Sequence, residues 1–154
     1  MTKHQQMQAF IRHYLQTTGK TEIDMKDVAA AAIKMGWVLP EPKTPEEVLA
    51  HEFSRAAREL TERDGKTGRP YRVYHAIAQG QGTFWVEINS APRKHMAKAV
   101  TQRREQSVGD IYQAVLDLDH WNRVHPGEQP IPFETDFTMD IELRKNVQED
   151  EQSG

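Results

Sequence analysis

The 154-residue sequence contains no cysteine. This absence excludes a disulfide-stapled fold, a zinc finger with cysteine ligands, an iron–sulfur cluster and a cysteine nucleophile. No hydrophobic run approaches the length that crosses a membrane, and the first residues lack the unbroken apolar stretch of a signal peptide. We therefore expect a cytoplasmic protein with no membrane partner.

Common catalytic motifs are also lacking. The GKT of residues 19–21 has no earlier glycine where a phosphate-binding loop needs one, residues 51–55 (HEFSR) lack the second histidine of a zinc protease helix, and no G-x-S-x-G occurs. Residues 117–125 (DLDHWNRVH) hold metal-ligand residue types, but a solvated helix end is the simpler interpretation. We expect no enzyme, no catalytic residue, no metal and no cofactor, with a metal-dependent nuclease at residues 117–125 as an alternative.

Charges of opposite sign gather in different parts of the chain. Residues 55–104 hold eleven Lys or Arg against four Asp or Glu, a net charge of +7. Residues 105–154 hold three basic against twelve acidic side chains, a net charge of −9. This asymmetry favours a polyanion-binding face beside an acidic part, although the same charges can merely solvate helices.

Apolar residues at helical spacing predict a first helix over residues 4–17, which Gly19 ends. Residues 21–23 (TEI) are then a candidate for a short strand. Asp24 is a suitable N-cap for a second, alanine-rich helix that ends at Gly36.

A third helix has the clearest start in the sequence. Thr44 fits the N-cap, Pro45 the first helical position, and Glu47 completes a capping box. Apolar residues line one face of this helix: Leu49, Phe53, Ala56 and Leu60. The opposite face carries His51, Arg55, Arg58 and Glu62.

A β-hairpin follows the third helix. Residues 71–78 (YRVYHAIA) and 83–88 (TFWVEI) alternate in polarity, and residues 79–82 (QGQG) between them have the composition of a turn. We expect Phe84, Val86 and Ile88 to share one face. Helix, short strand, helix, helix and hairpin is the element order of a winged helix-turn-helix, whose third helix enters the major groove of DNA.

Residues 19–88 resemble the HARE-HTH class of winged helices, with "GW", "TPEEVL", "GRPYR" and "GTFWV" in the expected order. The resemblance covers roughly the first 88 residues and implies a protein that engages DNA or the machinery acting on it. Two features depart from a strong DNA binder: the connector VLPEPKTPEE is acidic, and the wing tip QGQG is uncharged.

The remaining sequence predicts a long helix over residues 92–123, continuous or broken near Gly109. Its basic first half and acidic second half favour an antiparallel homodimer. Residues 131–143 alternate strictly between apolar and acidic or polar side chains, which predicts a half-buried terminal strand with a helical turn after Asp140 as an open alternative.

The sequence therefore predicts an α+β fold with a winged-helix domain over residues 1–90. Residues 91–146 would form an extension of helix and strand that packs on this domain or mediates dimerisation, and residues 147–154 a disordered tail.

The predicted function is duplex DNA binding by a small bacterial-type regulator or accessory factor; the alternative is a protein-interaction module that uses the winged-helix scaffold and the acidic C-terminal half. A homodimer and a protein partner stay open. The expected DNA contacts are His51, Arg55 and Arg58 from the third helix, Arg63, Lys66, Arg69 and Arg72 at the wing base, and Arg93, Lys94 and Lys98 as a second phosphate strip.

Overall fold

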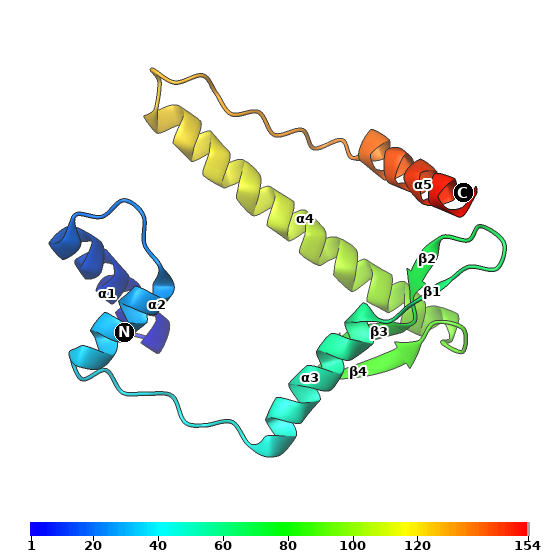
Figure 1. Ribbon diagram of the computed structural model, residues 1–154, viewed down its shortest axis with the longest axis horizontal. Coiled ribbons are helices and arrows are strands. Elements are labelled where there is room, and N and C mark those ends of the chain that lie inside the picture. Colours follow the sequence, from blue (N-terminus) through cyan, green and yellow to red (C-terminus); the bar gives the residue numbers. More distant parts are fainter. Residues whose placement is uncertain (154) are drawn as a thin grey trace. The chain divides into compact units, whose positions relative to one another are not determined.

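The structure, a computed structural model, describes residues 1–153, with side chains as far as residue 147. The described chain contains five helices and two two-stranded antiparallel sheets (Figure 1), in agreement with the predicted α+β class. It divides into two compact units, Met1–Pro45 and Glu46–Gly154. The predicted winged-helix domain of residues 1–90 extends over both units and stays a prediction.

The first unit is a pair of helices, α1 (Lys3–Thr18) and α2 (Met25–Lys34). As predicted, Gly19 ends α1 in the left-handed conformation, with φ of 66°, and the Asp24 side chain caps α2 by accepting a backbone hydrogen bond at 2.8 Å. The expected strand over residues 21–23 is wrong. These residues form the bend that reverses the chain between the two helices, and no described strand lies beside them to pair with.

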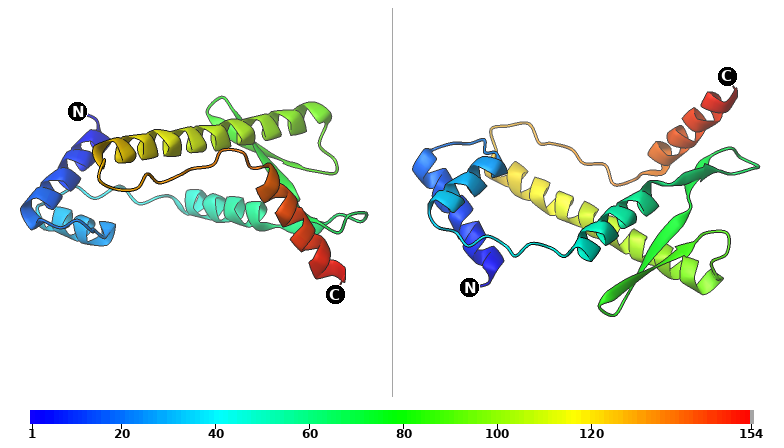
Figure 2. Two further views of the ribbon diagram at one scale, coloured as in Figure 1. Left: turned by 90° about the horizontal axis from the view of Figure 1, so that it is seen from above. Right: turned by 60° about the horizontal axis from the view of Figure 1, so that its bottom comes forward.

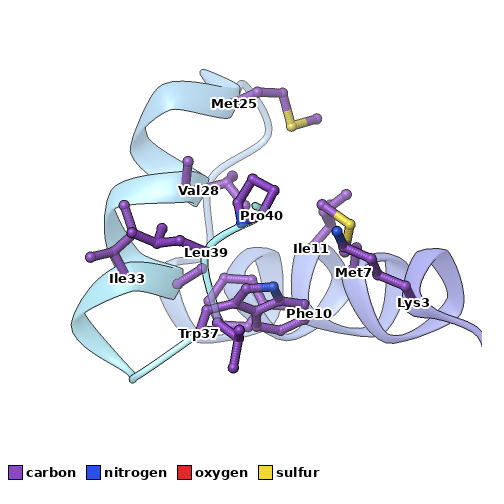
Figure 3. Close-up of a pocket in the computed structure, with 13 residues that line it drawn as sticks. Lys3, Met7, Phe10, Ile11, Met25, Val28, Ile33, Trp37, Leu39 and Pro40 are labelled. Atoms are coloured by element: carbon purple, nitrogen blue, oxygen red, sulfur yellow. The ribbon is translucent and has the colours of Figure 1, made fainter. Parts of the chain in front are cut away.

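An apolar groove of about 440 Å³ lies between α1, α2 and the segment that follows α2 (Figure 3). Phe10 and Trp37 meet edge to face in it, with ring centroids 5.5 Å apart. Val28 is the one buried residue among the described residues of this unit. The first unit therefore has a very small core and leaves much apolar surface exposed.

The second unit begins with α3 (Pro45–Glu59), whose first residue is the predicted one. Four short strands follow, and they form two hairpins: β1 (Thr61–Arg63) with β2 (Pro70–Arg72), and β3 (Tyr74–Gln79) with β4 (Gly82–Glu87). The second hairpin is the predicted one, although its first strand begins at Tyr74 rather than at residue 71. The β1–β2 hairpin was not expected, because the sequence indicates only a loop there.

The β3–β4 hairpin has two faces, and a helix lies beside each of them (Figures 1 and 2). One face packs against α4 (Arg93–Val124), where Ile77 and Ala99 are both 0 % exposed and the Phe84 ring meets the His95 ring at 5.3 Å. On the other face, Tyr74 and Trp85 line a pocket together with residues of α3. Helix α4 is continuous through Gly109 and confirms the long helix that the sequence predicts.

The strand predicted over residues 131–143 is wrong, and the helical turn expected after Asp140 as an alternative is part of a longer helix. Residues 131–137 have no regular structure, and α5 (Thr138–Ser153) occupies the second half of the expected strand. The Asp136 carboxylate accepts hydrogen bonds from the Thr138 backbone at 3.1 Å and from its hydroxyl at 2.7 Å, and so begins this helix. The predicted disordered tail is part of α5 up to Ser153, and Gly154 lies outside the described residues.

The irregular segment before α5 is tied back to α4. Asn122 accepts a hydrogen bond from the Ile131 backbone N–H at 3.0 Å and donates one to its carbonyl at 3.2 Å. In residues 1–153, none of the helices combines the length and the apolar character needed to span a membrane.

Candidate nucleic-acid interface

The β1–β2 hairpin presents basic side chains on a structured turn. The Asp64 carboxylate accepts backbone hydrogen bonds from Lys66 and Thr67, both at 2.9 Å, and these bonds hold the pKa of Asp64 below its ordinary value. The Arg63 guanidinium donates to the Gly68 carbonyl at 2.9 Å across the turn. Lys66 is thereby fixed at the tip of the hairpin with an exposed side chain.

A groove of about 650 Å³ runs along the open edge of β3, between α3 and α4. This edge groove brings together three arginines from separate parts of the sequence. They are Arg58 from the end of α3, Arg72 from the end of β2, and Arg103 from α4. All three side chains are exposed.

Two aromatic rings also line the edge groove. Trp85 of β4 lies beneath Arg58, whose guanidinium carbon is 5.1 Å from the indole centroid. Tyr74 of β3 lines the same groove and is 39 % exposed. Both rings stand on the hairpin face toward α3, where Phe53 and Ala57 line a second pocket with them. Arg58 therefore makes a cation–π contact at the point where α3 ends.

Gln102 of α4 connects that helix to β3. Its side-chain amide accepts from the Ala78 N–H and donates to the Ala78 carbonyl, both at 2.9 Å. The amide thus occupies the edge of β3 in the manner of a neighbouring strand. This pair of bonds fixes the α4 side of the groove, including the adjacent Arg103.

The three groove arginines share the groove with few acidic side chains. Within residues 1–147, no ion pair links Arg58, Arg72 or Arg103 to a carboxylate. Glu105 is the acidic residue that lines the groove with them. Three positive charges against one negative charge, beside the exposed ring of Tyr74 and the half-buried ring of Trp85, suit an anionic ligand with planar groups.

The other predicted contact residues lie on the same unit but outside the groove. Their side chains are exposed, except for Arg69, which is half-buried. They are His51 and Arg55 on α3, Arg63, Lys66 and Arg69 on the β1–β2 hairpin, and Arg93, Lys94 and Lys98 in the first turns of α4.

Sequence reasoning missed Arg103, Tyr74 and Trp85 as site residues. Arg103 belongs to the basic third of the chain, but only the packing of α4 against β3 brings it beside Arg58 and Arg72. Tyr74 is two residues before Ala76 on β3, and Ala76 pairs with Trp85 on β4, so all three side chains share one face of the hairpin. The alternation of the two strands was the sequence signal that could have placed both rings on that face.

Residues 117–125 do not converge. Asp117 accepts a hydrogen bond from Gln113 at 2.8 Å, and the His125 ring stacks on Trp121 with centroids 4.3 Å apart. Among the described residues, no three His, Asp or Glu side chains are gathered closely enough to hold a metal ion. His75, in the basic third, is buried, and its Nε2 lies 2.9 Å from the Arg72 carbonyl oxygen.

Comparison of the chain with protein-family models, with curated proteins and with solved structures gives no match.

Proposed function

We propose that the second unit binds nucleic acid through the edge groove and the basic residues around it, with duplex DNA as the ligand that the sequence predicts. The observation that carries this proposal is the convergence of Arg58, Arg72 and Arg103 beside Trp85, with no ion pair to a carboxylate within residues 1–147. The winged helix-turn-helix resemblance of residues 1–88 belongs to the same proposal. It is supported by the order of three helices followed by hairpins.

The basic side chains divide into two roles. Exposed cations at the tip of the β1–β2 hairpin and in the first turns of α4 would neutralise phosphates, which supplies affinity but no sequence information. Arg58 has a planar group held against Trp85, so its orientation is restricted. A restricted guanidinium suits a directed contact with a base better than a mobile lysine does.

Fluorescence anisotropy of a labelled random-sequence duplex tests this function. We expect micromolar binding that weakens steeply between about 50 mM and 200 mM salt. Lys66→Ala should reduce the slope of log K against log salt by about one, because one phosphate contact is lost. Lys26→Ala, a matched lysine change in α2, should leave the slope unchanged. No binding of the duplex at about 50 mM salt by a protein shown to be folded by circular dichroism would refute duplex DNA as the ligand.

Arg58→Ala provides a separate test of directed base contact. The variant should change the ranking of duplex sequences in a selection experiment, since a forked arginine contact distinguishes bases. An equal loss of affinity for all sequences would assign Arg58 to the phosphates instead.

A protein-interaction module is the alternative function, and the apolar surface of α3 favours it. Leu49 and Phe53 are 53 % and 66 % exposed, although the sequence predicts that they line a packed face. A pull-down from nuclease-treated extract distinguishes the two functions. Retention of a basic protein by the wild type and its loss with Phe53→Asp, without any DNA binding, would favour the alternative.

The predicted homodimer is also a proposal, and the middle of α4 supports it. Val108, Tyr112 and Leu116 follow one another at a spacing of four and are exposed. Covering this stripe with a second copy would remove apolar surface from water. Sedimentation equilibrium should then give twice the monomer mass for the wild type and the monomer mass for Tyr112→Glu; a monomeric wild type would exclude the dimer.

A further inference from the structure

Resting on the proposed nucleic-acid function, we infer that the edge groove binds an unpaired nucleotide, so that the preferred ligand is a single strand or a single-stranded end and not a blunt duplex. The first argument is size. The groove measures about 650 Å³, which falls within the range of small-molecule sites. A duplex keeps its bases stacked inside and cannot place one in such a groove, whereas a single strand can.

The second argument is the presence of planar surfaces for stacking. Tyr74 presents an exposed ring, and the guanidinium of Arg58 makes a cation–π contact with Trp85, with its carbon 5.1 Å from the indole centroid. Unpaired bases stack on aromatic rings and on arginine planes. The groove therefore offers two neighbouring surfaces for stacking, the Tyr74 ring and the Arg58 guanidinium. A base inside a duplex is already stacked on both sides, so it would gain nothing from either surface.

The third argument comes from the hydrogen-bonding pattern along β3. In an antiparallel pair, alternate residues direct both backbone groups away from the partner strand. Ala78 does so, because its N–H and C=O bind the Gln102 amide. Ala76 is two residues along the same strand and lines the groove, so its N–H and C=O face the same edge.

A nucleobase can form two hydrogen bonds with the N–H and C=O of Ala76, as the Gln102 side-chain amide does with the N–H and C=O of Ala78. Each of the four bases carries a hydrogen-bond donor beside an acceptor on its Watson–Crick edge. That edge is free only when the base is unpaired. The backbone contact would accept any base, so the groove should be selective for single strands and tolerant of sequence.

The charges of the groove complete the site. Arg72 and Arg103 come from different elements and can hold phosphates of a strand whose base lies at Ala76. Arg104 is the next residue on α4 and is equally exposed, but it does not line the groove. The two neighbouring arginines therefore form a matched pair for experiment.

The test measures anisotropy of the full chain with three labelled ligands of mixed sequence at one salt concentration. These are a single strand of about 12 nucleotides, a blunt duplex, and the same duplex with a single-stranded overhang. We expect the single strand and the overhang to bind about fivefold tighter than the blunt duplex, or better, since each stacked base adds at least this factor. Arg103→Ala should weaken single-strand binding about fivefold or more, and Arg104→Ala by less than about twofold.

A second measurement does not depend on those variants. In a Trp37→Phe/Trp121→Phe protein, Trp85 is the remaining tryptophan, and its fluorescence should be quenched by the single strand and not by the blunt duplex. Salt-dependent binding with equal or greater affinity for the blunt duplex would overturn this inference and leave the proposed function standing. Equal effects of the two arginine variants, or an unchanged Trp85 signal in the bound state, would also overturn it. Failure of all three ligands to bind would refute the proposed function itself.

Discussion

Removal of the Gln102 amide tests how α4 is fixed to the β3–β4 hairpin. The side chain makes two hydrogen bonds with Ala78, each 2.9 Å long. A neutral hydrogen bond contributes about 0.5–1.5 kcal/mol net, so Gln102→Ala removes about 1–3 kcal/mol. Ala78 is exposed, and water can reach its freed N–H and C=O. The expected loss is therefore in the lower half of that range, about 1–2 kcal/mol.

The control for this variant lies one turn further along the same helix. Gln106 also lines the edge groove, but its side chain makes no hydrogen bond within residues 1–147. Gln106→Ala carries the same small gain in helix propensity, so the difference between the two variants isolates the two bonds. Urea unfolding followed by far-ultraviolet circular dichroism measures both free energies. A difference of about 0.5 kcal/mol or less, the size of an ordinary surface effect, would refute the reasoning.

Three further predictions concern the core and the turns of the second unit. Ile77 is fully buried, so Ile77→Ala should cost about 2–5 kcal/mol in urea unfolding, and a cost below about 1 kcal/mol would contradict its place in the core. Gly80 has φ of 61°, so Gly80→Val should cost about 1–2 kcal/mol in a thermal melt, and a cost below about 0.5 kcal/mol would contradict the positive φ of this turn. The pKa of Asp64 is lowered in the folded protein, so the ionised carboxylate stabilises the fold fully above pH 3.8, the ordinary pKa. This contribution to the free energy of unfolding is lost as the pH falls through the pKa that Asp64 has in the folded protein. An NMR titration of the Lys66 and Thr67 amides should have its midpoint below 3.8; a midpoint at or above 3.8 would contradict the turn geometry.

Helix ends could be predicted from the sequence because they depend on neighbouring residues alone. Gly19 supplies a left-handed conformation, Asp24 supplies a cap, and Pro45 fits only the first turn of a helix. The long helix α4 was predicted from the spacing of its apolar residues. The turn of the β3–β4 hairpin was predicted for the same local reason, since Gly80 can adopt positive φ.

The terminal strand shows where local pattern fails. Alternation over residues 131–143 predicts a strand only if another strand is present to pair with it, and no described strand lies there. Met139 and Leu143 are exposed, so the alternation does not mark a buried face. The local hydrogen bonds from Thr138 to the Asp136 side chain decide the outcome in favour of a helix.

The edge groove was beyond local reasoning for a different physical reason. Arg58, Arg72 and Arg103 are separated along the chain, and each resembles any other exposed arginine of the basic third. Their convergence depends on α4 packing against one face of the hairpin and on the end of α3 lying beside Trp85 on the other. Sequence could therefore predict which part of the chain is basic, but not which arginines share a site with Trp85.

Photo-cross-linking of the full chain to a single strand that contains 5-iodouridine tests the central claim most directly, because it reports where nucleic acid contacts the protein. Mass spectrometry of the cross-linked peptides should identify Tyr74 or Trp85, and excess unlabelled single strand should suppress the product. Cross-links confined to aromatic residues of the first unit, such as Tyr14 or Trp37, would contradict the account. So would the absence of any cross-link at a concentration that saturates binding.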